Sequence, residues 1–254
     1  MTTFFHLPRE DVVFSLIFPR LEPQETWRLR LVCMEFCSLC EEYFAAFCTS
    51  IAYEELVLEE AETLRDRACI SRVLLASQKL KNISLCLSRR TASAVLNRAS
   101  ELLVTRMWNS HTNWKLVRLS LVAVDYSCDT NTSHHSGWER LGEKCTSLKE
   151  LHIEDMCPFD DRCLQSLTRQ CASLVDLTLK SLPALRGLYL QKLAETSHHL
   201  TTLNLSGCYN IEVEQLQRTV RYCHNVRGLD FSSMFAAVND ETILTAKEFC
   251  PHLQ

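Results

Sequence analysis

The chain has 254 residues, of which 46% are hydrophobic and 23% are charged, proportions that suit a globular protein with an apolar core. Its 27 basic and 31 acidic side chains give a formal net charge of -4, so no strong basic field is present to hold a nucleic-acid backbone. The 5 glycines form neither a GxGxxG nor a GxxxxGK[ST] string, which argues against a glycine-rich phosphate loop.

Targeting segments are absent from the sequence. The apolar run at the start of the sequence is too short for a secretory signal. Nowhere do about 18 uncharged apolar residues follow one another, as a membrane span needs. Without a secretory signal, the 14 cysteines are better explained as small buried hydrophobic residues than as a disulfide framework. We therefore predict a cytoplasmic or nuclear protein with neither a nucleic acid nor a membrane as its partner.

The amino-terminal segment, residues 7–40, predicts two or three short helices. Pro8 suits a first helical turn, and Glu10 and Asp11 suit the positive end of a helix dipole. Glu22 and Pro23 interrupt the apolar pattern, which resumes at Leu29 and continues to Leu39. A unit of about 40 residues is too small to be stable alone, so it should bury apolar surface against a partner or the neighbouring domain.

This segment resembles an F-box, which has an initial Leu-Pro, a Glu two residues later, an Ile-Phe pair, a Leu, and then Arg/Leu-x-x-Val-Cys-x-x-Phe. The matching residues are Leu7, Pro8, Glu10, Ile17, Phe18, Leu21, Arg28, Leu29, Val32, Cys33 and Phe36. The stretch from Glu10 to Ile17 is two residues longer than the common pattern, as in the F-box/LRR-repeat protein 15 group. The resemblance implies contacts with a Skp adaptor through Leu7, Pro8, Ile17, Phe18, Leu21, Leu29, Val32 and Phe36.

An internal repeat is the strongest signal in the remaining sequence. The pattern apolar-x-x-apolar-x-apolar occurs six times, and from Leu148 onward its first position recurs every 26 residues. The six copies are Leu80/Ile83/Leu85, Leu116/Leu119/Leu121, Leu148/Leu151/Ile153, Leu174/Leu177/Leu179, Leu200/Leu203/Leu205 and Val226/Leu229/Phe231. Each copy predicts a strand.

A helical pattern precedes each recurring cysteine, because apolar residues seven and four positions earlier share one helical face. These sets are Trp138/Leu141/Cys145, Leu164/Leu167/Cys171, Leu190/Leu193/Ser197, Leu216/Thr219/Cys223 and Ile243/Ala246/Cys250. Buried turn positions are expected at Phe159, Leu185, Ile211 and Val238, and helix caps at Asp160 and Asn239. Each unit is thus a strand, a turn and a helix, and the helix supplies the crossover between parallel strands.

These units resemble the cysteine-containing leucine-rich repeat, LxxLxLxxCxxITDxxLxxLxxxC, and residues 200–223 give the best copy. Cys208 occupies the in-turn position there, which Met156, Leu182 and Met234 fill elsewhere. The expected fold class is α/β: a three-helix F-box (1–45), a helical linker (46–78), and about six repeats (79–254) forming a solenoid with a parallel concave sheet and convex helices. Since residues 250–254 read as the opening of another repeat, we expect the last repeat to be incomplete and the chain to be a fragment of a longer protein.

The combined resemblance to the F-box/leucine-rich-repeat family implies a substrate-recognition subunit of an SCF-type ubiquitin ligase, assembled from a Skp adaptor, a cullin and the F-box protein. Such a subunit holds a target protein for ubiquitination and proteasomal degradation, with no cofactor and no catalytic residue of its own. An alternative is a leucine-rich-repeat scaffold or inhibitor without ligase assembly, for which the F-box string has no purpose. A third class, a cysteine-dependent enzyme, predicts one abnormally reactive thiol.

Substrate contacts are expected on the concave face, from residues that alternate with the core leucines. The predicted set is Arg118, Glu150, His152, Asp176, Thr178, Thr202, Asn204 and Asp230. Four acids on this face, Glu150, Glu154, Asp176 and Asp230, outnumber the bases Arg118 and Lys180. A basic recognition segment would fit such a face, although charge on a solvated sheet also serves solubility.

Candidate metal and catalytic motifs have simpler interpretations. Cys37 and Cys40 form a CxxC, but they fall on a predicted helix with Phe36 and Leu39, so core packing is favoured over zinc binding. The pairs His134-His135 and His198-His199 have no carboxylate or cysteine at a metal-binding spacing. Cys128 precedes His134 in a polar insertion, residues 126–137, expected to be a surface loop that cannot hold a catalytic geometry.

Overall fold

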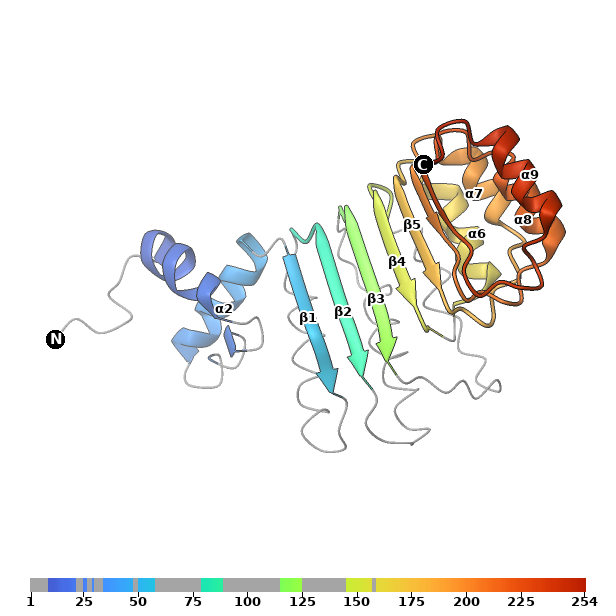
Figure 1. The fold of residues 1–254 in the computed structure, drawn as a ribbon. Helices are drawn as coiled ribbons and strands as arrows, with labels where there is room; N and C mark the ends of the chain where they lie inside the picture. Colours follow the sequence, from blue (N-terminus) through green and yellow to red (C-terminus); the bar gives the residue numbers. More distant parts are fainter. Residues whose placement is uncertain are drawn as a thin grey trace.

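The computed structural model describes residues 9–21, 25–26, 29, 34–47, 50–57, 79–88, 115–124, 145–156 and 159–254, and its architecture is α/β (Figure 1). One seven-stranded parallel sheet runs in chain order. Its strands are β1 (Ser50–Val57), β2 (Asn82–Ser88), β3 (Arg118–Val124), β4 (Glu150–Glu154), β5 (Asp176–Lys180), β6 (Thr202–Asn204) and β7 (Gly228–Asp230). The predicted α/β class and parallel sheet are confirmed, and the arrangement is compatible with a leucine-rich-repeat solenoid.

The sheet begins earlier in the chain than the sequence suggested. Strand β1 lies within 46–78, the segment expected to be a helical linker, so that expectation is wrong for residues 50–57. Ile51 pairs with Ile83 and Tyr53 with Leu85, which places β1 in register with β2. The β-branched and aromatic residues of β1 suit a strand, but no leading Leu-x-x-Leu marks it in the sequence. Residues 58–78 lie outside the described part of the chain.

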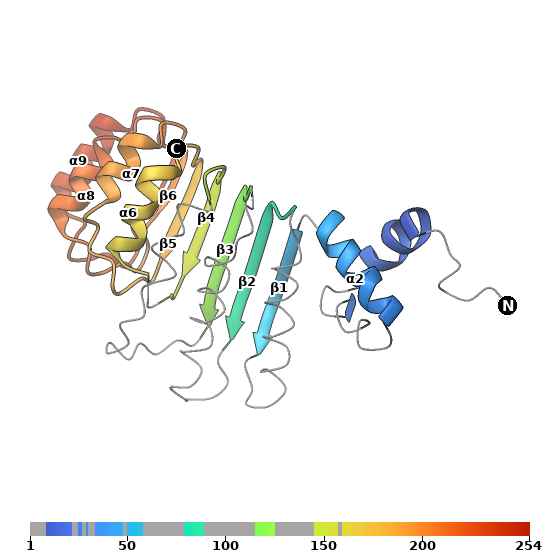
Figure 2. The ribbon, with the colours of Figure 1, turned by 180° about the vertical axis from the view of Figure 1, so that it is seen from behind.

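Helices cover one face of the carboxyl-terminal part of the sheet (Figures 1 and 2). They are α6 (Asp161–Gln170), α7 (Leu190–Thr196), α8 (Val213–Val220) and α9 (Asp240–Phe249), and each packs against the next. Asp160 caps α6, where its Oδ1 accepts hydrogen bonds from the amides of Arg162 (2.9 Å) and Cys163 (3.3 Å). Asn239 caps α9 through the amide of Thr242 (2.9 Å), so both predicted caps are confirmed.

The core is a stack of in-register leucines. Leu119, Leu151, Leu177, Leu203 and Leu229 occupy one register row from β3 to β7. The first four are fully buried, whereas Leu229 is half-buried because β7 is the edge strand of the described sheet. A 26-residue spacing brings equivalent residues together, so each unit buries its apolar residues against the next.

The recurring cysteines are part of this core. The Cys171 thiol donates to the carbonyl of Cys145 (3.1 Å), and the Ser197 hydroxyl donates to the carbonyl of Cys171 (3.4 Å). Burial raises the pKa of the Cys171 and Cys223 thiols to about 12 in each case. The described cysteines are all free thiols, and these buried ones are held protonated near neutral pH.

One predicted helical face is wrong at its first position. Ile243 is 59% exposed, and Thr242 takes the buried place instead. The Thr242 hydroxyl hydrogen-bonds to Asn239 Oδ1 (2.9 Å) and to the carbonyl of Ala237 (3.3 Å), which turns its side chain inward. Ala237 is likewise buried where Val238 was expected, and Val238 is half-buried. Of the other predicted helical faces, Trp138 and Leu141 lie outside the described residues.

A residue with positive φ follows each of four consecutive strands. These residues are Asp155 (φ 54), Ser181 (φ 51), Gly207 (φ 72) and Ser233 (φ 62), again 26 residues apart. The amide of Asp155 donates to the carbonyl of Lys180 (3.0 Å), and the amide of Gly207 donates to that of Ser232 (2.8 Å). The repeated left-handed turn therefore leads each strand away from the sheet in the same direction.

The amino-terminal helices form a small cluster joined to the sheet. The elements described over their full length are η2 (Arg9–Ile17), a π-helix, η3 (Phe18–Arg20), and α2 (Met34–Ala46), and the helical residue Leu29 packs against the same cluster. The stretch that is two residues longer than the F-box pattern lies in η2, where π-helical winding holds an additional residue in each hydrogen-bonded turn. Tyr43 of α2 packs against both the helical cluster and the main core, and Phe44 is buried in the main core.

Candidate functional site

The open face of the sheet lies opposite α6–α9 and carries polar side chains. Its residues alternate with the buried leucines of β4 and β5, so that both strands alternate half-buried and buried positions. The strand register places them in rows across the sheet. The first row is Arg118, Glu150, Asp176, Thr202 and Gly228, and the second is Ser120, His152, Thr178, Asn204 and Asp230. Glu154 and Lys180 are neighbours in a third row. All eight predicted substrate-binding residues lie on this one surface.

A hollow of about 430 Å³ opens on this face between β2 and β5. The side chains around it are Ser84, Arg118, Ser120, Glu150, His152, Asp176 and Thr178, together with Leu119 and Leu151. Ser84 was not among the predicted residues, although its alternation with Ile83 could have identified it. The hollow is open and combines polar with apolar lining atoms, which suits a peptide side chain better than an enclosed small molecule.

Arg118 and Glu150 form a bidentate ion pair across β3 and β4. Arg118 Nε lies 2.5 Å from Glu150 Oε2, and a second guanidinium nitrogen lies 2.9 Å from Oε1. The hydrogen bond with Glu150 raises the pKa of Arg118. Because the guanidinium group already pairs with Glu150, the positive charge of Arg118 is largely neutralised within the protein.

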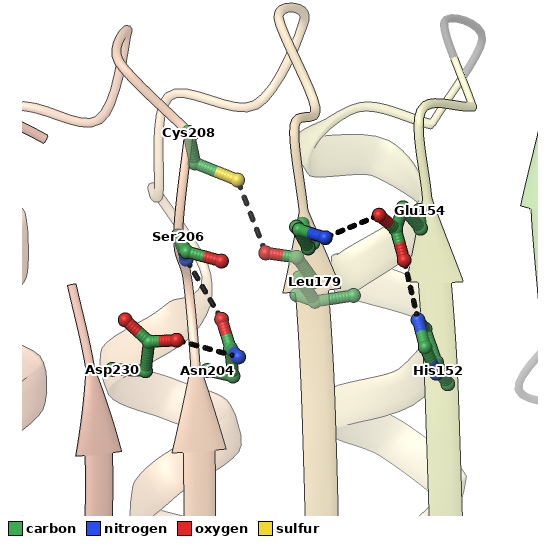
Figure 3. A network of polar contacts seen from close by, with 8 residues as sticks. His152, Glu154, Leu179, Asn204, Ser206, Cys208 and Asp230 are labelled. Carbon is green, nitrogen blue, oxygen red and sulfur yellow. Dashed lines mark hydrogen bonds and ion pairs between the residues drawn. The ribbon is translucent and has the colours of Figure 1, made fainter. Parts of the chain in front are cut away.

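A second charged group joins β4 and β5 (Figure 3). Glu154 accepts from Lys180 Nζ at 2.5 Å and lies 3.1 Å from His152 Nε2. Burial alone would raise the pKa of Glu154, but the hydrogen bonds from Lys180 and His152 outweigh it and hold the pKa below its ordinary value. Glu154 therefore stays ionised at neutral pH, and the positive charge of Lys180 is paired with it.

Neutral donors hold the carboxylate of Asp230 on β7 (Figure 3). Asn204 Nδ2 donates to it at 3.0 Å, and the Ser232 amide donates at 2.9 Å. The Ser232 hydroxyl and amide lower the pKa of Asp230, so the group is ionised at neutral pH. Next to it, the Ser206 hydroxyl is buried and has no hydrogen-bond partner among the residues that the structure describes, while its amide donates to Asn204 Oδ1 (2.9 Å).

Asp176 differs from the other three acids on the open face. Its amide donates to the carbonyl of Lys149 (3.0 Å), but within the described part of the chain its carboxylate makes no hydrogen bond or ion pair. Its register neighbours are Glu150 and Thr202. Two carboxylates side by side on neighbouring strands repel each other. Asp176 is therefore the acid on this face most available to a cation from outside the protein.

The predicted adaptor-binding residues divide by burial. Phe18 is 1% exposed and packs in the helical cluster, so it shapes the module from inside rather than presenting a surface. Ile17, Leu21 and Leu29 are half-buried against the same cluster, and Phe36 is also half-buried. Leu16, which the predicted set omitted, is 47% exposed. Leu7, Pro8 and Val32 lie outside the described residues.

The described cysteines and possible metal ligands can be placed individually. No three His, Cys, Asp or Glu side chains there are placed to hold a metal ion. The Cys40 thiol is buried and donates to the carbonyl of Thr26 (2.9 Å), and burial raises the pKa of Cys208 to about 11. Cys128, His134 and His135, in the expected surface loop at 126–137, lie outside the described residues.

No protein-family model matches the chain, and no curated protein matches its sequence. Among the described helices, none combines the length and apolarity that crossing a bilayer would require.

Proposed function

We propose that this chain is a non-catalytic substrate-recognition subunit of an SCF-type ubiquitin ligase, with an amino-terminal F-box and a leucine-rich-repeat solenoid. The F-box-like string from Leu7 to Phe36 carries this proposal, because its spaced Leu-Pro, Ile-Phe and Val-Cys-x-x-Phe elements occur together ahead of a parallel solenoid-like sheet. The first module would bind the Skp adaptor, and the open face would hold the target protein in the cytoplasm or nucleus.

The packing between the two regions supports this division of roles. The ring of Tyr43 lies edge-on to Phe18 with centroids 5.2 Å apart, and it also contacts Phe44, whose centroid is 5.4 Å away. Phe44 belongs to the core of the sheet, so this chain of aromatic contacts links the proposed adaptor-binding module directly to the proposed substrate-binding sheet. A receptor that acts by holding its target near a loaded enzyme benefits from such a fixed connection.

The buried thiols favour a binding role over cysteine catalysis. Desolvation raises the pKa of Cys145, Cys171, Cys208, Cys223 and Cys250, the opposite of what a nucleophilic thiolate needs. A receptor subunit requires no such activation, because the conjugating enzyme of the ligase supplies the reactive thioester.

Co-purification of the full chain with the Skp adaptor tests the proposal. The wild-type chain should capture the adaptor, and the Leu7→Ala/Pro8→Ala double variant should lose capture. Leu188→Ala is the matched control, because Leu188 is a 53% exposed leucine far along the chain in the strand–helix region. Failure of the folded wild-type chain to bind would overturn the ligase proposal and leave a leucine-rich-repeat scaffold.

A further inference from the structure

Resting on the proposed substrate-receptor role, we infer that the open face binds an extended basic segment of the target, with one cationic side chain at Asp176 and a second at Asp230. Two cations four residues apart in an extended strand fit the two sites.

The charge balance of the open face is negative after its internal pairs are formed. Glu150 is neutralised by Arg118, and Glu154 is neutralised by Lys180. Asp176 and Asp230 then form no ion pair among the described residues, although the charge of Arg118 acts on Asp176 and that of Lys180 acts on Asp230. A ligand that supplies two positive charges would complete the pairing without breaking either existing ion pair.

Asp176 offers the first cation site. It borders the 430 Å³ hollow together with Thr178, whose hydroxyl could accept a further hydrogen bond from a guanidinium. The neighbouring Glu150 carboxylate adds negative potential there, and a cation at Asp176 would relieve the repulsion between the two strands. A guanidinium is favoured over an ammonium ion because it can bridge a carboxylate and a hydroxyl with its planar donors.

Asp230 offers the second site. It receives hydrogen bonds from Asn204 and Ser232, which fix the carboxylate without neutralising it. The charge of Lys180 acts on Asp230, but the Lys180 ammonium group forms its ion pair with Glu154. A cationic side chain of the bound segment would therefore meet an ionised carboxylate that is already held in position.

Register sets the spacing between the two sites. Asp230 lies two strands from Asp176 and two residues further along, which corresponds to about 12 Å from strand spacings of about 4.8 Å and rises of about 3.3 Å. In an extended peptide, side chains on one face are separated by even numbers of residues, and four residues span about 13 Å. A spacing of two residues spans about half that distance, which is too short to reach from Asp176 to Asp230.

Fluorescence anisotropy with defined peptides tests the inference. The probes are fluorescein-labelled nine-residue Gly/Ser peptides carrying two arginines at spacings of two, four or six, and Gln-substituted versions of each. The full chain should bind the spacing-four arginine peptide at least about tenfold more tightly than its Gln version, and more tightly than the other spacings. Asp176→Asn and Asp230→Asn should each weaken this binding about tenfold.

Glu214→Gln is the matched control, because it removes one negative charge on the helical side, where Glu214 pairs with Arg218. This variant should leave peptide binding unchanged. Equal binding of arginine and Gln peptides, or an equal loss in the Glu214 variant, would overturn the inference. Adaptor capture with no peptide discrimination rejects the basic-segment inference alone, whereas peptide discrimination without adaptor capture rejects the ligase proposal alone.

Discussion

The two faces of the sheet are built from the same strands, but the same residue type recurs from strand to strand on one face and not on the other. Facing the helices, the register neighbours on β4, β5 and β6 are Leu151, Leu177 and Leu203. One residue further along, on the open face, they are His152, Thr178 and Asn204. The apolar side keeps leucine or isoleucine from strand to strand, whereas the open side changes residue type at each of these steps.

Packing explains this difference. A buried leucine is surrounded by the leucines of adjacent units, so its volume and shape are constrained on both sides. A residue on the open face meets solvent and has only its strand neighbours to satisfy. The helix-facing side can therefore maintain the stack while the open side varies for recognition.

The largest effect expected is the loss of one stacked leucine. Leu177→Ala removes a 1% exposed side chain between two similar neighbours and should lower the free energy of unfolding by about 2–5 kcal/mol. Thr178→Ala, the adjacent residue on the open face, should change it by less than about 0.5 kcal/mol. Urea denaturation of both variants measures the contrast, and similar losses would contradict the two-face comparison.

The left-handed turn that follows each of the four strands β4 to β7 should also contribute to stability. At Gly207 (φ 72) an added Cβ would lie 3.0 Å from the Ser181 hydroxyl, so Gly207→Ala should cost about 1–2 kcal/mol. Gly228→Ala is the control, because its Cβ would meet only Thr202 Cγ2 at 3.7 Å and φ there is not positive. That substitution should be neutral or slightly stabilising by thermal denaturation. Equal destabilisation by both would refute the turn argument.

Removal of a helix cap should have a somewhat smaller effect. Asp160→Ala leaves the amides of Arg162 and Cys163 without their acceptor and should cost about 1 kcal/mol in chemical denaturation. Asp160→Asn retains a capping oxygen and should remain close to the wild type. An asparagine variant as unstable as the alanine variant would indicate that the charge, rather than the hydrogen bonds, stabilises α6.

The smallest effect is expected on the open face, and it depends on pH. The pKa of Glu154 is lowered in the folded state, so its ion pair stabilises above the ordinary glutamate pKa and is lost as pH falls through the folded pKa. Glu154→Gln should therefore cost under about 1 kcal/mol at pH 7. The difference from the wild type, measured by urea denaturation, should shrink and close as pH falls below the lowered pKa of folded Glu154. A difference that persists in acid would show that packing, and not charge, is responsible.

Much of the fold follows from the spacing of apolar residues. Leucines 26 residues apart in the sequence become register neighbours, because one strand, one turn and one helix return the chain to the same place beside the preceding unit. Strand β1 is harder to find in this way, because Cys48, Ile51 and Tyr53 keep the apolar spacing but include no leucine. The inward turn of Thr242 also escaped prediction, because it depends on hydrogen bonds to Ala237 and Asn239.

For the candidate site, the sequence determined which residues share the open face, because strand alternation depends only on neighbours along the chain. Only the tertiary structure decided which charges are paired. Lys180 meets Glu154 and Arg118 meets Glu150 across strands, while Asp176 remains without a contacting cation within the described residues. The partners in these ion pairs are 26 or 32 residues apart in the sequence. The repeat spacing brings their strands side by side, but the strand register and the reach of the side chains decide which opposite charges meet.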